Sequence, residues 1–378
     1  MVAFKTKTDR SNRMTVREFC LDHSTWLLVA IIVTVWSPLF LSRPFVNWDD
    51  NENYLNHPNI AGGLFNNLQH IFSPLLGVIE PCANVVKLLV IAVTGTNVND
   101  GSARPFLLCN LLIHCCNTML IQKLAVAKRE FNWNRNLILI PALFAVHPLR
   151  VEAVAWASCL PYQVATFFSL LGCLCHETGR HRWKAFFFLC AVSSKASSIT
   201  VPLSLFCTDM WSITNGNHVY RSIRCNLTSL FMTVCGVILA MWANQESPIV
   251  RNMGWDAKIV RACWAWWWYW LKSIIPTNLN VIYILPGGTV EHLNVMGWFG
   301  WMPLSQPVLA TCIVLTTCVG ILLRAESIAP GRFDNKNADT RSFQRRWAMF
   351  LINYTIVLMP CLGLVQHGYL TMTADRCK

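Results

Sequence analysis

Two adjacent carboxylates, Asp49 and Asp50, stand in a polar string that follows the first long apolar run of the chain. Side-by-side carboxylates close to a bilayer are costly unless water or a counter-charge compensates them. Such a pair can take a proton from a hydroxyl group as a general base, or hold a divalent cation. The alternative is a solvated turn, because Asp and Asn are common turn residues and the string reads Asn47-Trp48-Asp49-Asp50-Asn51.

A second polar group, made of His147, Arg150 and Glu152, follows the short apolar stretch 136–146. A charge at the bilayer centre costs about 2.5–3.5 kcal/mol on insertion scales, so charges at membrane depth tend to be functional. A guanidinium group matches a phosphate with paired hydrogen bonds, which makes Arg150 a candidate phosphate ligand. The alternative is an interfacial turn held by a local Arg–Glu pair.

Lys195 follows Ser193-Ser194 inside an apolar run that continues toward Pro202 and Asp209. A lysine in the middle of an apolar helix is hard to explain as packing, and intramembrane ionisable residues are functional candidates by default. Snorkelling is the alternative, with the stem buried and the ammonium group at the interface.

Two further sets of polar residues have no chemistry that the sequence alone defines. Asn110, His114 and Asn117 recur at helical spacing on one face of an apolar segment, which favours helix packing through interhelical hydrogen bonds. Asp375 and Arg376 lie near the end of the sequence given, and nothing local explains them.

The elements that position these residues are predicted to be membrane helices. Of the 378 residues, 54% are hydrophobic and 13% are charged, whereas soluble domains have about 25% charged residues. A spanning helix needs about 20 apolar residues, so we expect an all-α polytopic membrane protein with about eight to ten membrane-embedded helices. The candidate segments are 25–41, 105–127, 152–175, 183–208, 226–243, 306–323 and 347–366, with shorter pieces at 82–93, 136–146 and 259–275.

The formal charge of +12 does not indicate nucleic-acid binding, because the basic residues fall in short stretches between apolar runs. That distribution is typical of cytosolic loops of membrane proteins, and 17 Trp fit the membrane interfaces. The basic leader 1–24 is therefore expected in the cytosol, and the loops 42–104 and 244–305 are expected on the luminal side. Segment 259–275 is expected to be interfacial or re-entrant, unless part of 276–303 also crosses the membrane, and its Trp-rich run favours an interfacial helix.

The 17 Cys do not predict a metal site, because most stand inside apolar runs and none forms a CxxC pair. Buried thiols of this kind behave as small hydrophobic side chains. No resident metal is therefore expected, apart from the divalent cation that Asp49 and Asp50 would be able to hold.

Five blocks resemble, in order, the membrane portion of the transmembrane and tetratricopeptide-repeat O-mannosyltransferases, a family of the GT-C class. The repeats of about 34 residues that relatives carry are not found in this sequence, so residues 25–376 are expected to form a GT-C-like transmembrane domain alone. The matching blocks are Phe45 to Glu52, Asn110 to Asn117, Leu143 to Trp156, Ser194-Lys195 with Pro202 and Asp209, and Gly363 to Gly368 leading to Ala374-Asp375-Arg376.

The resemblance implies transfer of mannose from dolichyl-phosphate-mannose to Ser/Thr hydroxyls of luminal proteins, in the endoplasmic reticulum membrane. It implies that Asp49 and Asp50 are catalytic. A polyprenyl-phosphate donor would also give Arg150, Lys195 and His147 a role at its phosphate. Supporting roles then fall to Glu152, Asn110, His114, Asp375 and Arg376.

Two other functions remain open. One is an inactive or truncated relative that acts as a membrane scaffold, and the other is a GT-C enzyme that uses a different lipid-linked sugar. A transporter is disfavoured because the sequence shows no pair of matching halves with interrupted helices. The expected partners are the lipid-linked donor, a luminal acceptor protein and membrane lipids, with no nucleic acid.

Overall fold

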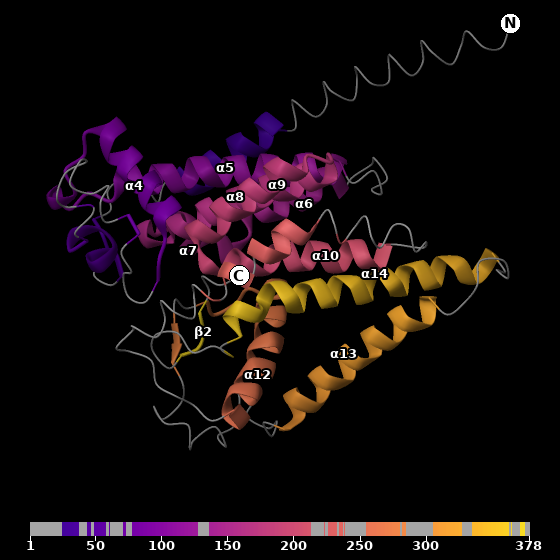
Figure 1. The fold of residues 1–378 in the computed structure, drawn as a ribbon. Helices are drawn as coiled ribbons and strands as arrows, with labels where there is room; N and C mark the ends of the chain where they lie inside the picture. Colours follow the sequence, from indigo (N-terminus) through magenta and orange to yellow (C-terminus); the bar gives the residue numbers. More distant parts are fainter. Residues whose placement is uncertain are drawn as a thin grey trace, which may run out of the picture. The chain divides into compact units, whose positions relative to one another are not determined.

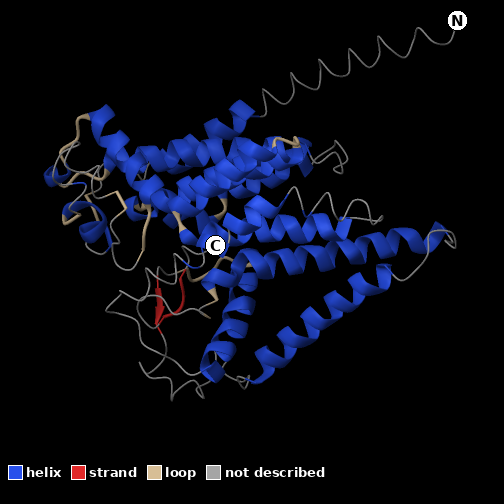
Figure 2. Ribbon diagram, viewed as in Figure 1, coloured by secondary structure: helices blue, strands red, loops and turns tan. Residues whose placement is uncertain are grey.

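The fold is that of a mostly helical protein, seen here in a computed structural model (Figure 1, Figure 2). It describes residues 25–37, 44–46, 49–57, 60, 71–72, 78–127, 136–212, 223, 226–232, 234–236, 238, 255–279, 282–284, 305–326, 335–362, 364 and 371–374. The leader predicted over 1–24, Asp375 and Arg376 lie outside these residues. The chain divides into two compact units, and the boundaries between them fall at His70/Ile71, inside helix α4 (Pro81–Thr94) and at Arg180/His181.

The first unit is organised by the packing of α5 (Arg104–Ala127) along α8 (Leu160–Glu177). The polar face predicted on α5 is buried in this contact: the Asn117 amide donates to the Gln163 backbone carbonyl at 3.2 Å and to its side-chain oxygen at 3.0 Å. Interhelical hydrogen bonds of this kind replace the water that an apolar surrounding lacks. The packing interpretation of this face is therefore correct for Asn117.

A bend of 54° separates the helical segments Ile138–Val146 and Pro148–Ala155. Pro148 has no N–H to donate, and the Leu149 N–H bonds to Nδ1 of His147 at 3.2 Å, outside the helical ladder. The Ala145 carbonyl, which would have accepted from Leu149 in a continuous helix, instead lies 3.0 Å from Trp36 Nε1 and 3.0 Å from His114 Nε2. The bend thus joins the helix Thr25–Trp36 and α5 to one carbonyl group.

In the second unit, helices that follow one another in the sequence pack together, and so do two helices that are distant in the sequence. Helix α12 packs on α13, α13 on α14, and α14 on α10 (Figure 1). Two indoles of α12 donate to neighbouring helices, from Trp266 to Thr355 of α14 at 3.0 Å and from Trp267 to Thr311 of α13 at 2.9 Å. The helices are α9 (His181–Ser194), α10 (Thr200–Ser212), α12 (Trp255–Ile274), α13 (Ser305–Glu326) and α14 (Asn335–Leu358).

A buried polar chain ties α9 to α10 in this unit. The Lys184 ammonium donates to Oδ1 of Asn226 at 2.8 Å, and the Asn226 amide donates to Asp209 at 2.7 Å. The positive and negative ends of the chain compensate each other across a neutral amide, which offsets part of the cost of burying them. Asp209, singled out in the sequence, therefore has a structural partner.

The helical membrane class predicted from the sequence is confirmed. Among the described residues, two helices are long and apolar enough to cross a membrane, Arg104–Ala127 and Ala157–Glu177, and a third is counted if the bent pair forms one span. The larger number of spans and the sidedness of the loops stay predictions. One short antiparallel ribbon, β1 (Ile282–Ile284) with β2 (Thr371–Ala374), was not predicted, because strands this short leave little alternation to recognise.

Two predicted continuous helices are interrupted. The segment 152–175 breaks at Trp156, whose backbone is extended with φ −123° and ψ 125°. The segment 183–208 breaks at Lys195, which is extended with φ −157° and ψ 126° between α9 and the short helix η7 (Ala196–Ile199). Placing Lys195 in the middle of a helix was therefore wrong, since hydropathy averaged over a segment does not detect a single extended residue.

Replacing Asn117 by Leu removes the amide that joins α5 to α8 while keeping the number and branching of the side-chain heavy atoms. We expect the stability of the protein in detergent to fall by about 1 kcal/mol, within the range measured for interhelical hydrogen bonds in membranes. Leu112→Ala on the same helix is the control, because Leu112 is 59% exposed. Equal unfolding midpoints for N117L and the wild-type chain would refute a stabilising role for this contact.

Candidate functional site

The acidic pair lies at the start of the short helix η2 (Asn51–Leu55), which is anchored by an aromatic cluster. The Tyr54 ring stacks with Phe45 at 5.0 Å between centroids and lies 4.5 Å from the Phe106 centroid on α5. The Phe45 N–H donates to the Gly101 carbonyl at 3.3 Å, where a φ of +72° requires glycine. Large buried rings thus fix the loop that carries the two carboxylates.

The two carboxylates differ in their surroundings. Asp49 is half-buried, whereas Asp50 is 1% exposed. The Val46 N–H donates to Oδ2 of Asp50 at 2.9 Å, and the Ser158 N–H donates to Oδ1 at 2.9 Å. The Ser158 hydroxyl makes a short hydrogen bond to the same oxygen. Asp50 is therefore held on both oxygens, and Asp49 is the more accessible carboxylate.

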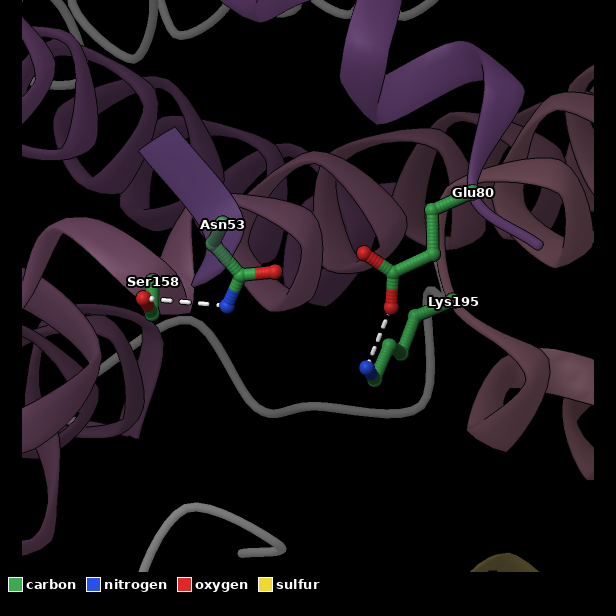
Figure 3. Close-up of polar contacts among 4 residues, drawn as sticks. All are labelled: Asn53, Glu80, Ser158 and Lys195. Atoms are coloured by element: carbon green, nitrogen blue, oxygen red, sulfur yellow. Dashed lines mark hydrogen bonds and ion pairs between the residues drawn. The ribbon is translucent and has the colours of Figure 1, made fainter. Parts of the chain in front are cut away.

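The direction of the Ser158 hydroxyl is set by a third residue. The Asn53 side-chain N–H donates to Oγ of Ser158 at 3.1 Å (Figure 3). An amide N–H is only a donor, so Oγ accepts this bond and its own hydrogen points to Asp50. The relay from Asn53 through Ser158 to Asp50 therefore delivers a donor to the carboxylate.

Burial raises the pKa of Asp50 above its ordinary value, and hydrogen bonds from Ser158, Val46 and Trp156 offset only part of this effect. Desolvation disfavours the charged form, while donors aimed at the carboxylate favour it. Asp50 thus binds a proton more readily in the folded protein than in an unfolded chain, and the Ser158 hydroxyl is the strongest of the groups that oppose this.

The segment that carries Ser158 is held by side chains on either side. Because Trp156 is extended, the helical ladder stops between α7 (Val151–Ala155) and η6 (Ala157–Cys159), and backbone groups there need other partners. Asn110 donates to the Trp156 carbonyl at 2.9 Å, and the Tyr54 hydroxyl donates to the Ala157 carbonyl at 2.7 Å. Asn110, predicted as a supporting residue, thus positions the partner of Asp50.

Of the predicted group His147, Arg150 and Glu152, Arg150 lies against an aromatic ring. The Arg150 guanidinium lies over Phe144 at 4.7 Å, and His114 stacks on the same ring at 5.2 Å. His147 caps the short helix η5 (Pro148–Arg150) through Nδ1, and Glu152 stands in the first turn of α7. These positions give His114 and His147 structural contacts, and they fix the backbone beside Arg150.

Lys195 belongs to the second unit, where it forms an ion pair with Glu80 (Figure 3). The sequence reasoning did not select Glu80. The signal that was available is an acidic residue directly before Pro81, the first residue of an apolar helix, where a carboxylate complements the helix dipole.

A buried lysine in the first unit was also missed. Lys87 on α4 is 1% exposed, and its ammonium group lies 5.1 Å from the Tyr54 ring centroid. Burial, and secondly the charge of Lys87, lowers the pKa of His57 to about 4, so that this imidazole is neutral at physiological pH. A single charge within an otherwise apolar helix was the signal in the sequence.

No group of three or more His, Cys, Asp or Glu side chains in the described part of the chain is arranged to hold a metal ion. Of the residues that the sequence selected, the structure brings Asp50, Asn110 and the Trp156 block together, and it places His114, Phe144 and Arg150 side by side. A cation at Asp49 and Asp50 stays a prediction.

Comparison with known proteins gives one distant match. A protein O-mannosyl-transferase of Caenorhabditis elegans is 23% identical over 282 residues, which covers 71% of this chain and 40% of the relative. The chain thus spans about two fifths of the length of the curated relative it matches. No protein-family model matches the chain, and no solved structure matches it.

Replacing Ser158 by Ala removes the hydroxyl that opposes the raised pKa of Asp50, so this pKa should rise further. A raised carboxyl pKa means that stability is lost as pH rises through it, and the loss is larger in the variant. We expect S158A to be about 1.5–3 kcal/mol less stable than wild type above the folded pKa of Asp50. The deficit should shrink as the pH falls from the Asp50 pKa of the variant to the lower Asp50 pKa of the wild-type chain, because Asp50 of the variant becomes protonated first.

Unfolding midpoints measured against pH in detergent test this expectation. Thr166→Ala is the matched control, because its hydroxyl donates to the Tyr162 carbonyl at 2.8 Å and has no titratable partner. A deficit of S158A that is constant with pH, as expected for T166A, would contradict the coupling of Ser158 to the Asp50 charge.

Proposed function

We propose that this chain is a membrane glycosyltransferase that moves mannose from dolichyl-phosphate-mannose to Ser/Thr hydroxyls of luminal proteins. The observation that carries the proposal is the acidic pair, with Asp50 locked on Ser158 and Asp49 left accessible beside it. The name of the distant relative, a protein O-mannosyl-transferase, supports the reaction class, and the apolar helices support the membrane setting.

In the proposed reaction, Asp49 is the general base. Its carboxylate takes the proton of the acceptor hydroxyl, and the oxygen forms a bond to the anomeric carbon of mannose. The bond from that carbon to the phosphate oxygen breaks, and its electron pair leaves with dolichyl phosphate. Positioned bases of this kind contribute about 10²–10⁴-fold to rate.

Asp50 has a different role in this proposal. Its buried carboxylate, with Val46 and Ser158 bonded to both oxygens, is poorly placed to meet a substrate and well placed to fix the backbone of Asp49. Preorganisation of this kind keeps a base at reacting distance without a rearrangement during catalysis. Asp50 is thus a positioning residue, whereas the sequence treated the two carboxylates alike.

Cationic groups are needed for the phosphate that leaves. We assign Arg150 to this charge and His147 to the turn that carries Arg150, and we keep Lys195, which belongs to the second unit, as a separate candidate ligand of a lipid phosphate. The endoplasmic reticulum membrane, with the N-terminus in the cytosol, is the location in which such a donor and acceptor would meet. A different lipid-linked sugar would use the same residues, and a scaffold would need none of this chemistry.

Asp49→Asn should reduce transfer of labelled mannose from dolichyl-phosphate-mannose to a Ser/Thr-rich peptide by about 100-fold, the contribution typical of a general base. The unfolding midpoint of D49N is measured on the same preparation, so that loss of the base is distinguished from loss of the fold. Glu52→Gln makes the same chemical change on the exposed side of η2 and should keep full activity. Transfer by D49N at the wild-type rate would refute the assignment.

The substitution Asp50→Asn distinguishes a positioning role of Asp50 from a role as the general base. An amide offers one acceptor oxygen where the carboxylate offers two, so either Val46 or Ser158 loses its partner. We expect D50N to lower both the unfolding midpoint and the transfer rate, measured on the same preparation. Loss of transfer without any loss of stability would instead make Asp50 the base.

A further inference from the structure

Glu80 and Lys195 form an ion pair whose two side chains are only 9% and 18% exposed. The pair lies within the second unit, and its partners are separated by 115 positions in the sequence (Figure 3). An ammonium group that is already neutralised attracts a further anion weakly. The pair therefore bears directly on how Lys195 would meet a phosphate.

Neither Glu80 nor Lys195 belongs to a regular helix. Lys195 is the extended residue between α9 and η7, with its N–H bonded to the Ala191 carbonyl at 3.0 Å and its own carbonyl accepting from Ser198 at 3.1 Å. Glu80 directly precedes Pro81, the first residue of α4. The Lys195 backbone is thus held by two hydrogen bonds, and the Lys195 and Glu80 side chains meet from positions outside regular helices.

The charge balance of the pair permits an exchange of partners. In a pair this little exposed, removal of one partner leaves an uncompensated charge, whereas replacement of one anion by another keeps Lys195 neutralised. Lys195 keeps some exposure, so another anion is able to reach it. A phosphate provides more acceptor oxygens than a carboxylate and, as a monoester, more charge.

We propose that Glu80 is a positioning residue that holds Lys195 in the resting protein and yields it to the phosphate of a polyprenyl-phosphate lipid. The proposal rests on the proposed function and adds a carboxylate that competes with the lipid phosphate. After the lipid leaves, Glu80 takes Lys195 back, which limits how tightly the phosphate product is retained.

The test measures binding of dolichyl phosphate to the purified full chain in detergent micelles. Glu80→Gln removes the competing charge and is expected to bind dolichyl phosphate about tenfold more tightly, equivalent to about 1.4 kcal/mol. Its KM for dolichyl-phosphate-mannose should fall, and kcat should not rise. If Glu80 had only a structural role, E80Q would bind dolichyl phosphate more weakly than the wild-type chain or equally well.

Matched variants separate competition from a general change in charge or fold. Glu177→Gln, an exposed carboxylate at the end of α8, should bind as wild type does. Glu80→Asp keeps the charge on a shorter side chain, so its affinity for dolichyl phosphate should lie between those of the wild-type chain and E80Q. This variant therefore provides the test if E80Q does not fold. In a Lys195→Gln background, Glu80→Gln should no longer tighten binding.

Inorganic phosphate distinguishes the sources of the anion. Displacement of bound dolichyl phosphate by millimolar phosphate would show that Lys195 recognises the free group, and a lack of displacement would show that the lipid form is required. Both results support the exchange if E80Q binds more tightly. Wild-type binding of dolichyl phosphate without tighter binding by folded E80Q or E80D would overturn the inference. Absence of both binding and transfer in the wild-type chain would instead contradict the proposed function.

Discussion

The hydrogen bonds between Asp50 and Ser158 are the constraint on which the rest of the candidate site depends. They join the loop that follows the first apolar helix to Ser158 in η6, the short helix before α8, 108 positions away. Burial opposes the charge of Asp50, and the relay from Asn53 through Ser158 offsets part of that opposition. Because both oxygens of Asp50 are occupied, the more accessible carboxylate is the neighbouring Asp49, and the proposed function therefore gives the two acids different roles.

Helix breaks supply the anchors in this protein. At Trp156 the interrupted ladder leaves carbonyl groups that Asn110 and Tyr54 occupy, and at Pro148 it frees the Ala145 carbonyl for Trp36 and His114. Inside a bilayer such groups have no water to bond, so polar side chains on neighbouring helices must reach them. Residues that appear functional by type, such as His114, are thereby explained as partners of the backbone.

The sequence was a good guide to helices and a poor guide to partners. The bounds of α5 and α6 were predicted closely, because apolar length alone defines them. The breaks at Trp156 and Lys195 were missed, since each depends on contacts with distant segments. The partners Ser158 and Glu80 were missed for the same reason, because only folding places Ser158 against Asp50 and Glu80 against Lys195. Asp49 and Asp50 were recognised as a pair, but their different burial was not visible in the sequence.

A structure of the full chain with dolichyl-phosphate-mannose and an acceptor peptide would test the central claim most directly. The measured quantity is the distance from each carboxylate to the acceptor hydroxyl. The account predicts that Asp49 lies within about 2.6–3.2 Å of that hydroxyl, or reaches it through one water, while Asp50 keeps its bonds to Ser158. An acceptor hydroxyl bonded to Asp50, with Asp49 turned away from the sugar, would contradict it.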